Sequence, residues 1–367
     1  MRDLKNKSIK RIVVRGTNWV GDAVMTVPAL RELRRLIPNA HLTLATRSWA
    51  QELFADADFI DDLLVSDRRG LGAVRAQVHE WKERKFDLAV LFQNAFEAAL
   101  IPALARIPFR VGYATERRGF LLTHSLNLPE WQSSKHEVFY YLNIVAALER
   151  LIKDGERKPD DYEPEFQLKV SEGRRANAVN FLVRHGVDGE HKLIALCPGS
   201  INSRAKRWPA ESFAALADLL IDRHAQVLLI GSPEELDVSL EVARHMRHEP
   251  IMLTGKTNLS QAIEILDTVD LLVTNDTGPA HIAAALGRPT LVIFGPTNPV
   301  TTRPFSSNSE IVRHPPECAP CMLRDCPIDH RCMTAISPAE VFARAQAMLD
   351  SHEHLADPGL CPTGAVA

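Results

Sequence analysis

The sequence lacks any apolar run long enough to cross a membrane. No stretch among its 367 residues approaches the roughly 18 consecutive apolar residues that a transmembrane helix requires. Near the N-terminus the first apolar run, residues 12–14, is also too short for the hydrophobic region of a secretory signal. We therefore expect a cytoplasmic protein without a transmembrane helix.

A strong charge of either sign is also missing. The formal net charge is −3, which excludes a polycation built to bind nucleic acid. Local basic clusters lie mostly in the first third of the chain, at residues 34–35, 68–69, 82–85 and 117–118. They are either solvated helix faces or a surface that meets a phosphorylated or membrane-borne partner.

Cysteine is scarce outside one short segment. Four of the six cysteines are Cys318, Cys321, Cys326 and Cys332, and a cytosolic chain keeps its thiols reduced, which argues against a disulfide framework. The C-x2-C-x4-C-x5-C spacing supplies the ligand count of a tetrahedral zinc site. A small structural metal site and plain reduced thiols both remain open, and neither places a metal in a reaction.

Short β-branched runs alternate with helical patterns along the chain. Strands are predicted at residues 11–14, 41–45, 63–65 and 87–92, and again at 193–197, 227–230, 251–253, 271–274 and 290–294. Helices between the strands imply right-handed crossovers and parallel sheets, and thus an α/β protein.

A polar segment at residues 153–162 is the expected interdomain linker. It divides the chain into an N-terminal domain at 1–160 and a C-terminal domain at 161–350, followed by a loose tail at 351–367. A cleft between two such domains is a common place for a ligand.

The stretch Asn275-Asp276-Thr277-Gly278 joins the end of a predicted strand to a helix. The unpaired N–H groups at a helix N-terminus suit a phosphate or diphosphate, Gly278 allows close approach of the backbone, and His281 lies one turn further on. Ordinary capping by Asp276 or Thr277, with His281 merely packed, is the alternative. The place of this stretch at the carboxyl end of a parallel strand favours a ligand site.

Two further loops follow strands of the same half. The first contains Arg204, Lys206 and Arg207, of which Lys206 is the candidate to neutralise a diphosphate, whereas the two arginines are better explained as solvated loop charges. The second contains Glu234 and Glu235. A carboxylate there suits ribose hydroxyls, but a first-turn acid that favours the helix dipole explains it equally well.

The first strand runs into a loop that matches neither the G-x-G-x-x-G nor the P-loop pattern. Asp22 lies at the elbow between this strand and the next helix, where an acid is either a general base or a helix cap. The same helix contains Pro28. Either the helix starts at Asp22 and kinks, or Thr26 caps it and Pro28 lies in its first turn.

Several separated motifs together resemble a known family. They are Trp19-Val20-Gly21-Asp22-Ala23-Val24-Met25 with Pro28-Ala29-Leu30, Pro198-Gly199 with Lys206-Arg207-Trp208-Pro209, Asn275-Asp276-Thr277-Gly278 with His281, and Gly295-Pro296-Thr297. This set is similar to the lipopolysaccharide heptosyltransferases of glycosyltransferase family 9, and the Trp-Val-Gly-Asp form is most similar to the heptosyltransferase II group. The resemblance covers about residues 10 to 300.

The resemblance implies a GT-B architecture, in which two Rossmann-like domains face each other across a cleft. It implies an inverting transfer of heptose from ADP-L-glycero-D-manno-heptose to a heptosyl-Kdo-lipid A inner core, with no cofactor and no essential metal. By position, Asp22 matches the catalytic base, Lys206 the diphosphate lysine and Glu235 the ribose-binding acid, with Glu234 adjacent. The turn that contacts phosphate and sugar is matched by Asp276, Thr277, Gly278 and His281.

Two other functions fit the same architecture. One is a UDP-sugar epimerase, which needs no acceptor, and the other is a nucleotide-sugar-binding protein without catalysis. The loop that contains Asp22 and the basic N-terminal half favour a transferase with an anionic acceptor. Because such an acceptor is lipid-linked, we expect the protein to work peripherally at the cytoplasmic face of the inner membrane, without a nucleic-acid partner.

Overall fold

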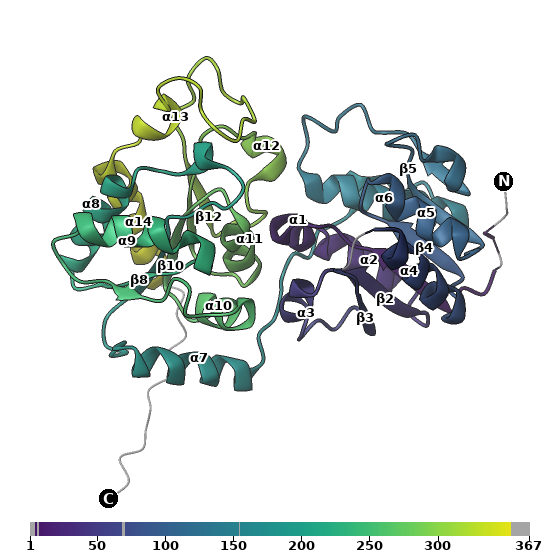
Figure 1. Ribbon diagram of the computed structural model, residues 1–367, viewed down its shortest axis with the longest axis horizontal. Coiled ribbons are helices and arrows are strands. Elements are labelled where there is room, and N and C mark those ends of the chain that lie inside the picture. The colour runs from purple at the N-terminus through teal and green to yellow at the C-terminus, as the bar shows by residue number, and fades with distance from the viewer. Residues whose placement is uncertain (1–3, 6, 68–69, 154, 354–367) are drawn as a thin grey trace, which may run out of the picture.

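The protein has two lobes, each built on one parallel sheet (Figure 1). The structure is a computed structural model that describes residues 4–5, 7–67, 70–153 and 155–353. Every strand pairs in parallel with its neighbours, as the alternation of strands and helices predicts. The predicted α/β class is therefore confirmed.

The first lobe contains six strands in the order β3-β2-β1-β4-β5-β6. These are β1 (Arg11–Arg15), β2 (His41–Thr46), β3 (Asp62–Val65), β4 (Leu88–Leu91), β5 (Phe109–Tyr113) and β6 (His124–Leu126). The helices around them are α1 (Val20–Met25), α2 (Val27–Leu36), α3 (Trp49–Leu53), α4 (Leu71–Glu83), α5 (Phe96–Leu104) and α6 (Glu137–Lys153), with a 3-10 turn η1 (Gly119–Leu121). β1 and β4 lie at the centre and are almost wholly buried, because helices cover both faces of the sheet.

The second lobe repeats this plan in the order β12-β11-β10-β7-β8-β9. Its strands are β7 (Leu193–Cys197), β8 (Gln226–Leu229), β9 (Ile251–Met252), β10 (Leu271–Asn275), β11 (Thr290–Ile293) and β12 (Ser309–Val312). Its helices are α7 (Glu172–Arg184), α8 (Ala210–Ile221), α9 (Leu236–His245), α10 (Leu259–Leu266), α11 (Gly278–Ala285), α12 (Pro299–Thr302), α13 (Arg331–Thr334) and α14 (Pro338–Glu353). Two 3-10 turns complete it, η3 (Arg204–Lys206) and η4 (Pro233–Glu235), whereas η2 (Pro159–Asp161) packs on α6 of the first lobe.

The helical pattern around Pro28 forms two helices. α1 ends at Met25, and α2 begins at Val27 with Pro28 in its first turn, where the missing N–H of proline breaks no helical hydrogen bond. Thr26 lies between them, but its hydroxyl donates to the carbonyl of Ala23 at 2.7 Å instead of capping α2. Because of this turn, α1 is a separate short helix.

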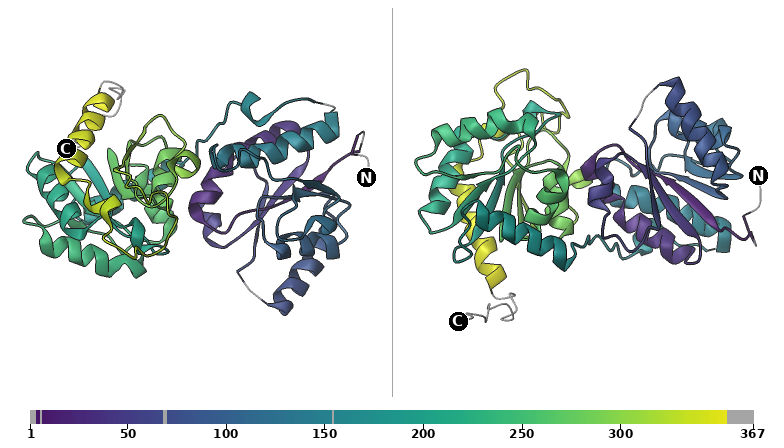
Figure 2. Two further views of the ribbon diagram at one scale, coloured as in Figure 1. Left: turned by 90° about the horizontal axis from the view of Figure 1, so that it is seen from above. Right: turned by 60° about the horizontal axis from the view of Figure 1, so that its bottom comes forward.

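The two lobes contact each other directly. α1 packs against α11, and α3 packs against α10, so that α1 and α11 lie side by side between the sheets (Figures 1 and 2). One buried apolar cluster runs from Val24 in the first lobe to Ile282 in the second. The Arg174 guanidinium adds an ion pair to Asp56 at 2.8 Å across the same boundary. We call the contact of α1 with α11 the α1–α11 junction.

No helix in the described part of the chain is long and apolar enough to cross a membrane. At the C-terminal end, α14 packs on α8 in the second lobe and continues through Glu353 (Figure 2). Of the tail predicted at residues 351–367, residues 351–353 belong to the last turn of this helix. Residues 354–367 lie outside the described residues.

Candidate active site at the junction of the lobes

Three loops of the second lobe leave neighbouring strands at one edge of the sheet. β10, β7 and β8 are adjacent, and their carboxyl ends lead to the loops that contain Asp276, Lys206 and Glu235. The carboxyl ends of parallel strands share one edge, where open α/β sheets bind ligands. The topology thus brings the predicted donor-side residues to one place.

Lys206 lies at the end of η3, and its ammonium group reaches the next loop. Nζ donates to Oδ2 of Asp276 at 2.8 Å and to the backbone carbonyl of Asp276 at 3.0 Å. The Lys206 side chain is 26% exposed, whereas that of Asp276 is 4% exposed. The lysine is therefore held by a buried carboxylate while part of it stays accessible to a ligand.

Two neighbours fix the Asp276 loop. The hydroxyl of Thr297 donates to Oδ2 of Asp276 at 2.6 Å. The side-chain amide of Asn275 donates to the carbonyl of Pro198 at 2.8 Å and accepts from the N–H of Trp208 at 3.0 Å. Both residues belong to the motifs of the sequence, but a positioning role for either becomes visible only when the loops are seen together.

The helix α11 begins at Gly278, and its first turn carries no side-chain cap. Thr277 is the N-cap residue by position, but its hydroxyl donates to the carbonyl of Asn275 at 3.3 Å and makes no capping bond. The Asp276 carboxylate is bonded to Lys206 and Thr297 as described. Thr277 thus holds the N-cap position without a side-chain capping bond, and the first N–H groups of α11 keep the capacity to bind an anion.

His281 lies one turn into α11 and is buried against α1. A Cβ atom added to Gly21 would lie 2.9 Å from Cδ2 of His281, so only glycine permits this approach. Burial lowers the pKa of His281 to about 4, which keeps the ring neutral at pH 7. Among the described residues its Nδ1 atom has no hydrogen-bond partner. A buried polar atom of this kind is costly unless a ligand pairs with it.

The two glutamates of the third loop differ in position. Glu234 is exposed, whereas Glu235 is half-buried and points to the loop after β7, where a Cβ added to Gly199 would lie 2.2 Å from Oε1 of Glu235. Oε2 of Glu235 accepts the N–H of Ser232 at 2.9 Å. Oε2 of Glu235 thus stabilises the turn that contains Glu235, and Oε1 lies beside the loop that contains Lys206. Of the two acids, only Glu235 faces the candidate site.

Asp22 is the third residue of α1 and lies at the α1–α11 junction. The N-cap residue is Trp19, so Asp22 does not hold the capping position. Burial raises the pKa of Asp22 to about 6, and the nearby charge of Lys206 acts in the opposite direction. The carboxyl group from one lobe and the ammonium group from the other are therefore close enough to influence each other.

Glu137 is a second half-buried acid at this place, and it was not predicted from the sequence. It opens α6, which packs against α1. Burial, followed by the nearby charge of Asp22, raises the pKa of Glu137 to about 7. His136 precedes it and hydrogen-bonds through Nε2 to the carbonyl of Arg303 in the other lobe at 2.6 Å. No local motif marks Glu137, because only the packing of α6 on α1 brings it to Asp22.

The loop arginines behave as the sequence predicts. Arg204 is 77% exposed and pairs with Asp325 at 2.7 Å, and Arg207 donates to the carbonyl of Ser200 at 2.9 Å. Neither approaches Asp276. Of the three cations in the loop, Lys206 alone joins the cluster.

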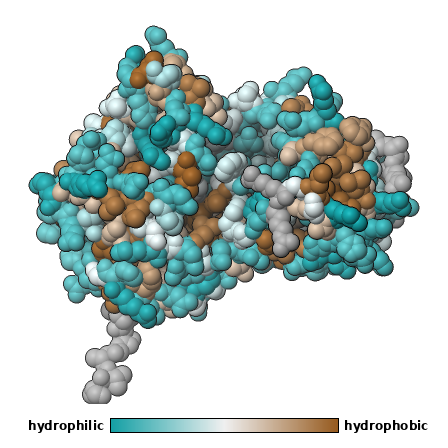
Figure 3. Space-filling view, in the orientation of Figure 1, coloured by the Kyte–Doolittle hydropathy of each residue, from teal (hydrophilic) through white to brown (hydrophobic). Residues whose placement is uncertain are grey.

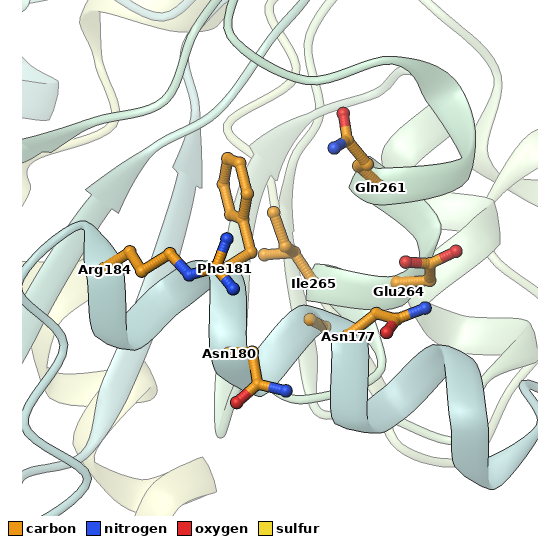
Figure 4. A pocket seen from close by; sticks show the side chains of 8 residues that line it. Asn177, Asn180, Phe181, Arg184, Gln261, Glu264 and Ile265 are labelled. Atoms are coloured by element: carbon orange, nitrogen blue, oxygen red, sulfur yellow. The ribbon is translucent and has the colours of Figure 1, made fainter.

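Two other features lie away from these residues. A surface pocket of about 360 Å³ lies between α7 and α10, and Figure 4 shows Arg184 and Phe181 on one side of it and Gln261 and Glu264 on the other. None of the predicted site residues lines it. Among the described residues, the one group with three metal-ligating atoms within 4.8 Å of one another is Glu211, Glu241 and His245, all exposed.

Two parallel six-stranded sheets in separate lobes, with charged residues gathered where the lobes meet, are the arrangement of glycosyltransferases of the GT-B class. The family comparison agrees, since the model of glycosyltransferase family 9 (heptosyltransferase) matches residues 74–331. The chain belongs to this family.

Individual relatives sharpen the similarity. The chain is 30% identical over 319 residues to lipopolysaccharide heptosyltransferase 2 of Escherichia coli, covering 83% of this chain and 88% of that protein. It is 31% identical over 322 residues to the protein of the same name from Salmonella typhimurium, with the same coverage.

A solved structure agrees with these relatives. The structure of E. coli ADP-heptose LPS heptosyltransferase II matches with a TM-score of 0.80 at 29% identity, covering 94% of this chain and 99% of that one. The predicted GT-B fold and the likeness to heptosyltransferase II are confirmed. The comparisons favour a sugar transferase over the UDP-sugar epimerase and over a non-catalytic binding protein.

Proposed function

We propose that this enzyme transfers heptose, with inversion, from ADP-L-glycero-D-manno-heptose to the heptosyl-Kdo-lipid A inner core of lipopolysaccharide. The observation that carries the proposal is the packing of α1, which contains Asp22, against α11, beside whose first residue Asp276 holds Lys206. A base and a leaving-group cation on opposite sides of one site are what direct inversion requires. The names of the relatives, lipopolysaccharide heptosyltransferase 2, supply the sugar and the acceptor class.

The second lobe binds the donor in this proposal. Lys206 and the first N–H groups of α11, at Gly278, support the diphosphate, with Asp276 and Thr277 shaping the turn. The Oε1 atom of Glu235 accepts hydrogen bonds from ribose hydroxyls. The unpaired Nδ1 atom of His281 is within the same turn and bonds to a phosphate or sugar oxygen.

The reaction is one displacement at the anomeric carbon. Asp22 accepts the proton of the acceptor hydroxyl, and the oxygen forms a bond to the anomeric carbon as the bond from that carbon to the diphosphate oxygen breaks. The electron pair leaves with ADP, whose growing charge Lys206 and the α11 N-terminus stabilise. The proton rests on Asp22. A pKa of about 6 suits an acid that must be ionised at pH 7 and still accept a proton.

The first lobe and the membrane surface provide the acceptor in this proposal. The acceptor is anionic and lipid-linked, and exposed basic residues such as Arg117 lie on the acceptor-side lobe. The enzyme therefore works peripherally at the cytoplasmic face of the inner membrane, held by salt-sensitive attraction to anionic groups.

A transfer assay tests this function. The purified full chain is incubated with ADP-heptose and a heptosyl-Kdo-lipid A acceptor, and the acceptor is weighed by mass spectrometry while released ADP is measured. We expect the acceptor to gain one heptose for each ADP released, and the new linkage to have the anomeric configuration opposite to that of the donor. Equal or faster use of a UDP-sugar, or conversion of a UDP-sugar without acceptor, would favour the epimerase.

A further inference from the structure

The segment from Thr297 to Phe305 connects the donor-side loops of the second lobe to the first lobe, and we call it the bridging segment. It follows β11 and contains α12, which lies on the side of the second lobe that faces the first (Figure 1). Its first residue contacts Asp276, and its last residue contacts α6. Neither contact takes part in the proposed reaction.

Thr297 shares one oxygen atom of Asp276 with Lys206. The hydroxyl of Thr297 donates to Oδ2 of Asp276 at 2.6 Å, and Nζ of Lys206 donates to the same oxygen at 2.8 Å. Thr297 and Asp276 are both buried, so the carboxylate is held away from water. A buried carboxylate whose bonds are satisfied in this way has a fixed orientation. Thr297 therefore fixes the group that holds Lys206.

Hydrogen bonds on either side of α12 join the bridging segment to the first lobe. Before α12, the side-chain amide of Asn298 donates to the carbonyl of Ser133 at 3.3 Å. After α12, the carbonyl oxygen of Arg303 lies 2.6 Å from Nε2 of His136. Ser133 and His136 both lie just before α6, so the segment is bonded twice to the same part of the first lobe.

The hydrogen bonds of His136 determine which of its ring nitrogens carries the proton. The N–H of Val138 donates to Nδ1 at 3.2 Å, so Nδ1 is an acceptor. Nε2 therefore carries the proton and donates to the carbonyl of Arg303, which can only accept. Burial lowers the pKa of His136 to about 4, so the ring is neutral at pH 7 and keeps this donor.

Phe305 packs among aromatic rings at the other end of the bridging segment. Its ring centroid lies 5.0 Å from that of His136 and 5.9 Å from that of Phe139 in α6. A third ring, that of Phe166 in the connection between the lobes, is also 5.9 Å away. Aromatic pairs at these separations stabilise a contact beyond the burial of their area. Phe305 thus anchors the segment on the first lobe.

Internal hydrogen bonds make the bridging segment compact between its two ends. The hydroxyls of Thr301 and Thr302 each donate to the carbonyl of Asn298 at 3.1 Å. The N–H of Arg303 donates to the carbonyl of Pro299 at 3.2 Å. A displacement at one end of such a turn is passed to the other end, because no flexible loop absorbs it.

We propose that the bridging segment couples the contact between the lobes to the donor site, with Thr297 and His136 as positioning residues for Lys206. Docking of its last residues on the first lobe holds the segment, and the held segment keeps the Thr297 hydroxyl on Asp276. Asp276 in turn fixes the ammonium group of Lys206. The link to ADP rests on the proposed function, in which Lys206 supports the diphosphate.

ADP affinity tests the role of Thr297. In calorimetry with the full chain, we expect Thr297→Val to weaken ADP binding about tenfold, because a hydrogen bond to a charged group is lost. Thr297→Ser keeps the hydroxyl and should bind ADP as the wild type does. Val300→Ala is the matched control, since Val300 lies in the same segment but is 53% exposed. Equal losses in the valine and serine variants would overturn the role of the hydroxyl.

A double-mutant cycle tests the coupling between the lobes. His136→Phe keeps a ring but removes the Nε2 donor, and we expect ADP binding to weaken about fivefold although His136 lies on the other lobe. Effects of independent residues multiply, whereas effects within one network do not. Thr297→Val combined with His136→Phe should therefore bind ADP about as well as Thr297→Val alone. A loss equal to the product, about fiftyfold, would overturn the coupling.

The same titrations separate the coupling from the proposed function. Circular dichroism checks the fold of each variant, and Phe305→Leu replaces His136→Phe in the cycle if the latter does not fold. If the wild type binds ADP and these first-lobe contacts can be removed without any loss of affinity, the coupling is overturned and the proposed transfer is untouched. A wild-type chain that does not bind ADP would overturn both.

Discussion

At the scale of single residues, the site depends on two half-buried acids. Burial raises the pKa of both Asp22 and Glu137, and the charge of Asp22 raises the pKa of Glu137 further. Lys206 offsets part of this rise for Asp22. Both acids therefore titrate close to neutral pH, and Asp22 is the one suited to accept a proton.

The pH profile follows from this arrangement. Because Asp22 must be ionised to accept a proton, we expect kcat to fall as the pH falls through about 6. Glu137, whose pKa is raised to about 7 by burial and by the charge of Asp22, still carries its proton at pH 6, so we expect Glu137→Gln to leave the acid side of the profile in place. The measurement is the rate of heptose transfer against pH for both proteins. A shift of the acid side to lower pH in Glu137→Gln would contradict this order of titration, because it would show that Glu137 is already ionised when Asp22 titrates.

The substitution Lys206→Ala tests whether Lys206 supports the diphosphate of the donor. We expect ADP binding to weaken by about 1.5–3 kcal/mol in calorimetry, since a hydrogen bond to a charged group is lost. Arg204→Ala is the matched control, because Arg204 belongs to the same turn but is exposed and pairs with Asp325. Equal losses in the two variants would contradict the special role of Lys206.

At the scale of elements, the α1–α11 junction requires close contact of two helices. Gly21 is the point where α1 meets His281, and Gly278 is the point where α11 meets Val20, with an added Cβ at 3.3 Å. A side chain at either position pushes the helices apart. The distance between base and donor site is thus set by two glycines and not by a flexible loop.

Gly21→Ala tests this geometry. We expect kcat to fall by about 10²-fold, the loss expected when reacting groups are displaced by about 1 Å, with ADP binding nearly unchanged because Gly21 lies on the acceptor-side lobe. Gly72→Ala in α4, where an added Cβ meets nothing within 4 Å, should keep full activity. Wild-type activity in Gly21→Ala would mean that the contact is not needed.

Strands that are buried on both faces were predictable because each contains a run of at least three consecutive apolar residues. β1, β7 and β10 contain such runs, and their predicted bounds differ by at most one residue from those observed. β12 and β6 escaped prediction, since Ser309–Val312 and His124–Leu126 are short edge strands with polar residues. α5 escaped because Pro102 interrupts a pattern that reads as apolar throughout.

The site was predictable where its residues follow a strand in a compact motif. Asp22, Lys206 and Asp276 each do so, and family resemblance adds their roles. Glu137 and the hydrogen bond from Thr297 to Asp276 were not predictable, because both depend on the packing of segments far apart in the chain. Local pattern cannot show which acid a neighbouring helix will bury.

At the scale of the whole molecule, the outer surface of the first lobe combines apolar and basic groups. Figure 3 shows a hydrophobic area on this lobe. Phe120 is 77% and Leu104 is 53% exposed, and Arg117 is also exposed. Such a surface suits weak contact with an anionic membrane, where each basic residue contributes about 1 kcal/mol.

Vesicle binding tests this contact. We expect the full chain to sediment with vesicles that contain anionic lipid at low salt, and to be released as added salt screens the charges. Vesicles of neutral lipid alone should bind much less. Binding that resists high salt and requires detergent for release would contradict a peripheral, electrostatic contact.

In the proposed reaction the base lies on one lobe and the leaving-group support on the other, so the chemistry needs the complete two-lobed molecule. The most direct test is the single-turnover rate of heptose transfer by Asp22→Asn with saturating donor and acceptor. The substitution keeps the size of the side chain, and ADP affinity serves as the check on folding. We predict wild-type ADP affinity with a rate reduced by about 10²–10⁴-fold. A variant that binds ADP normally and transfers heptose at the wild-type rate would contradict the central claim.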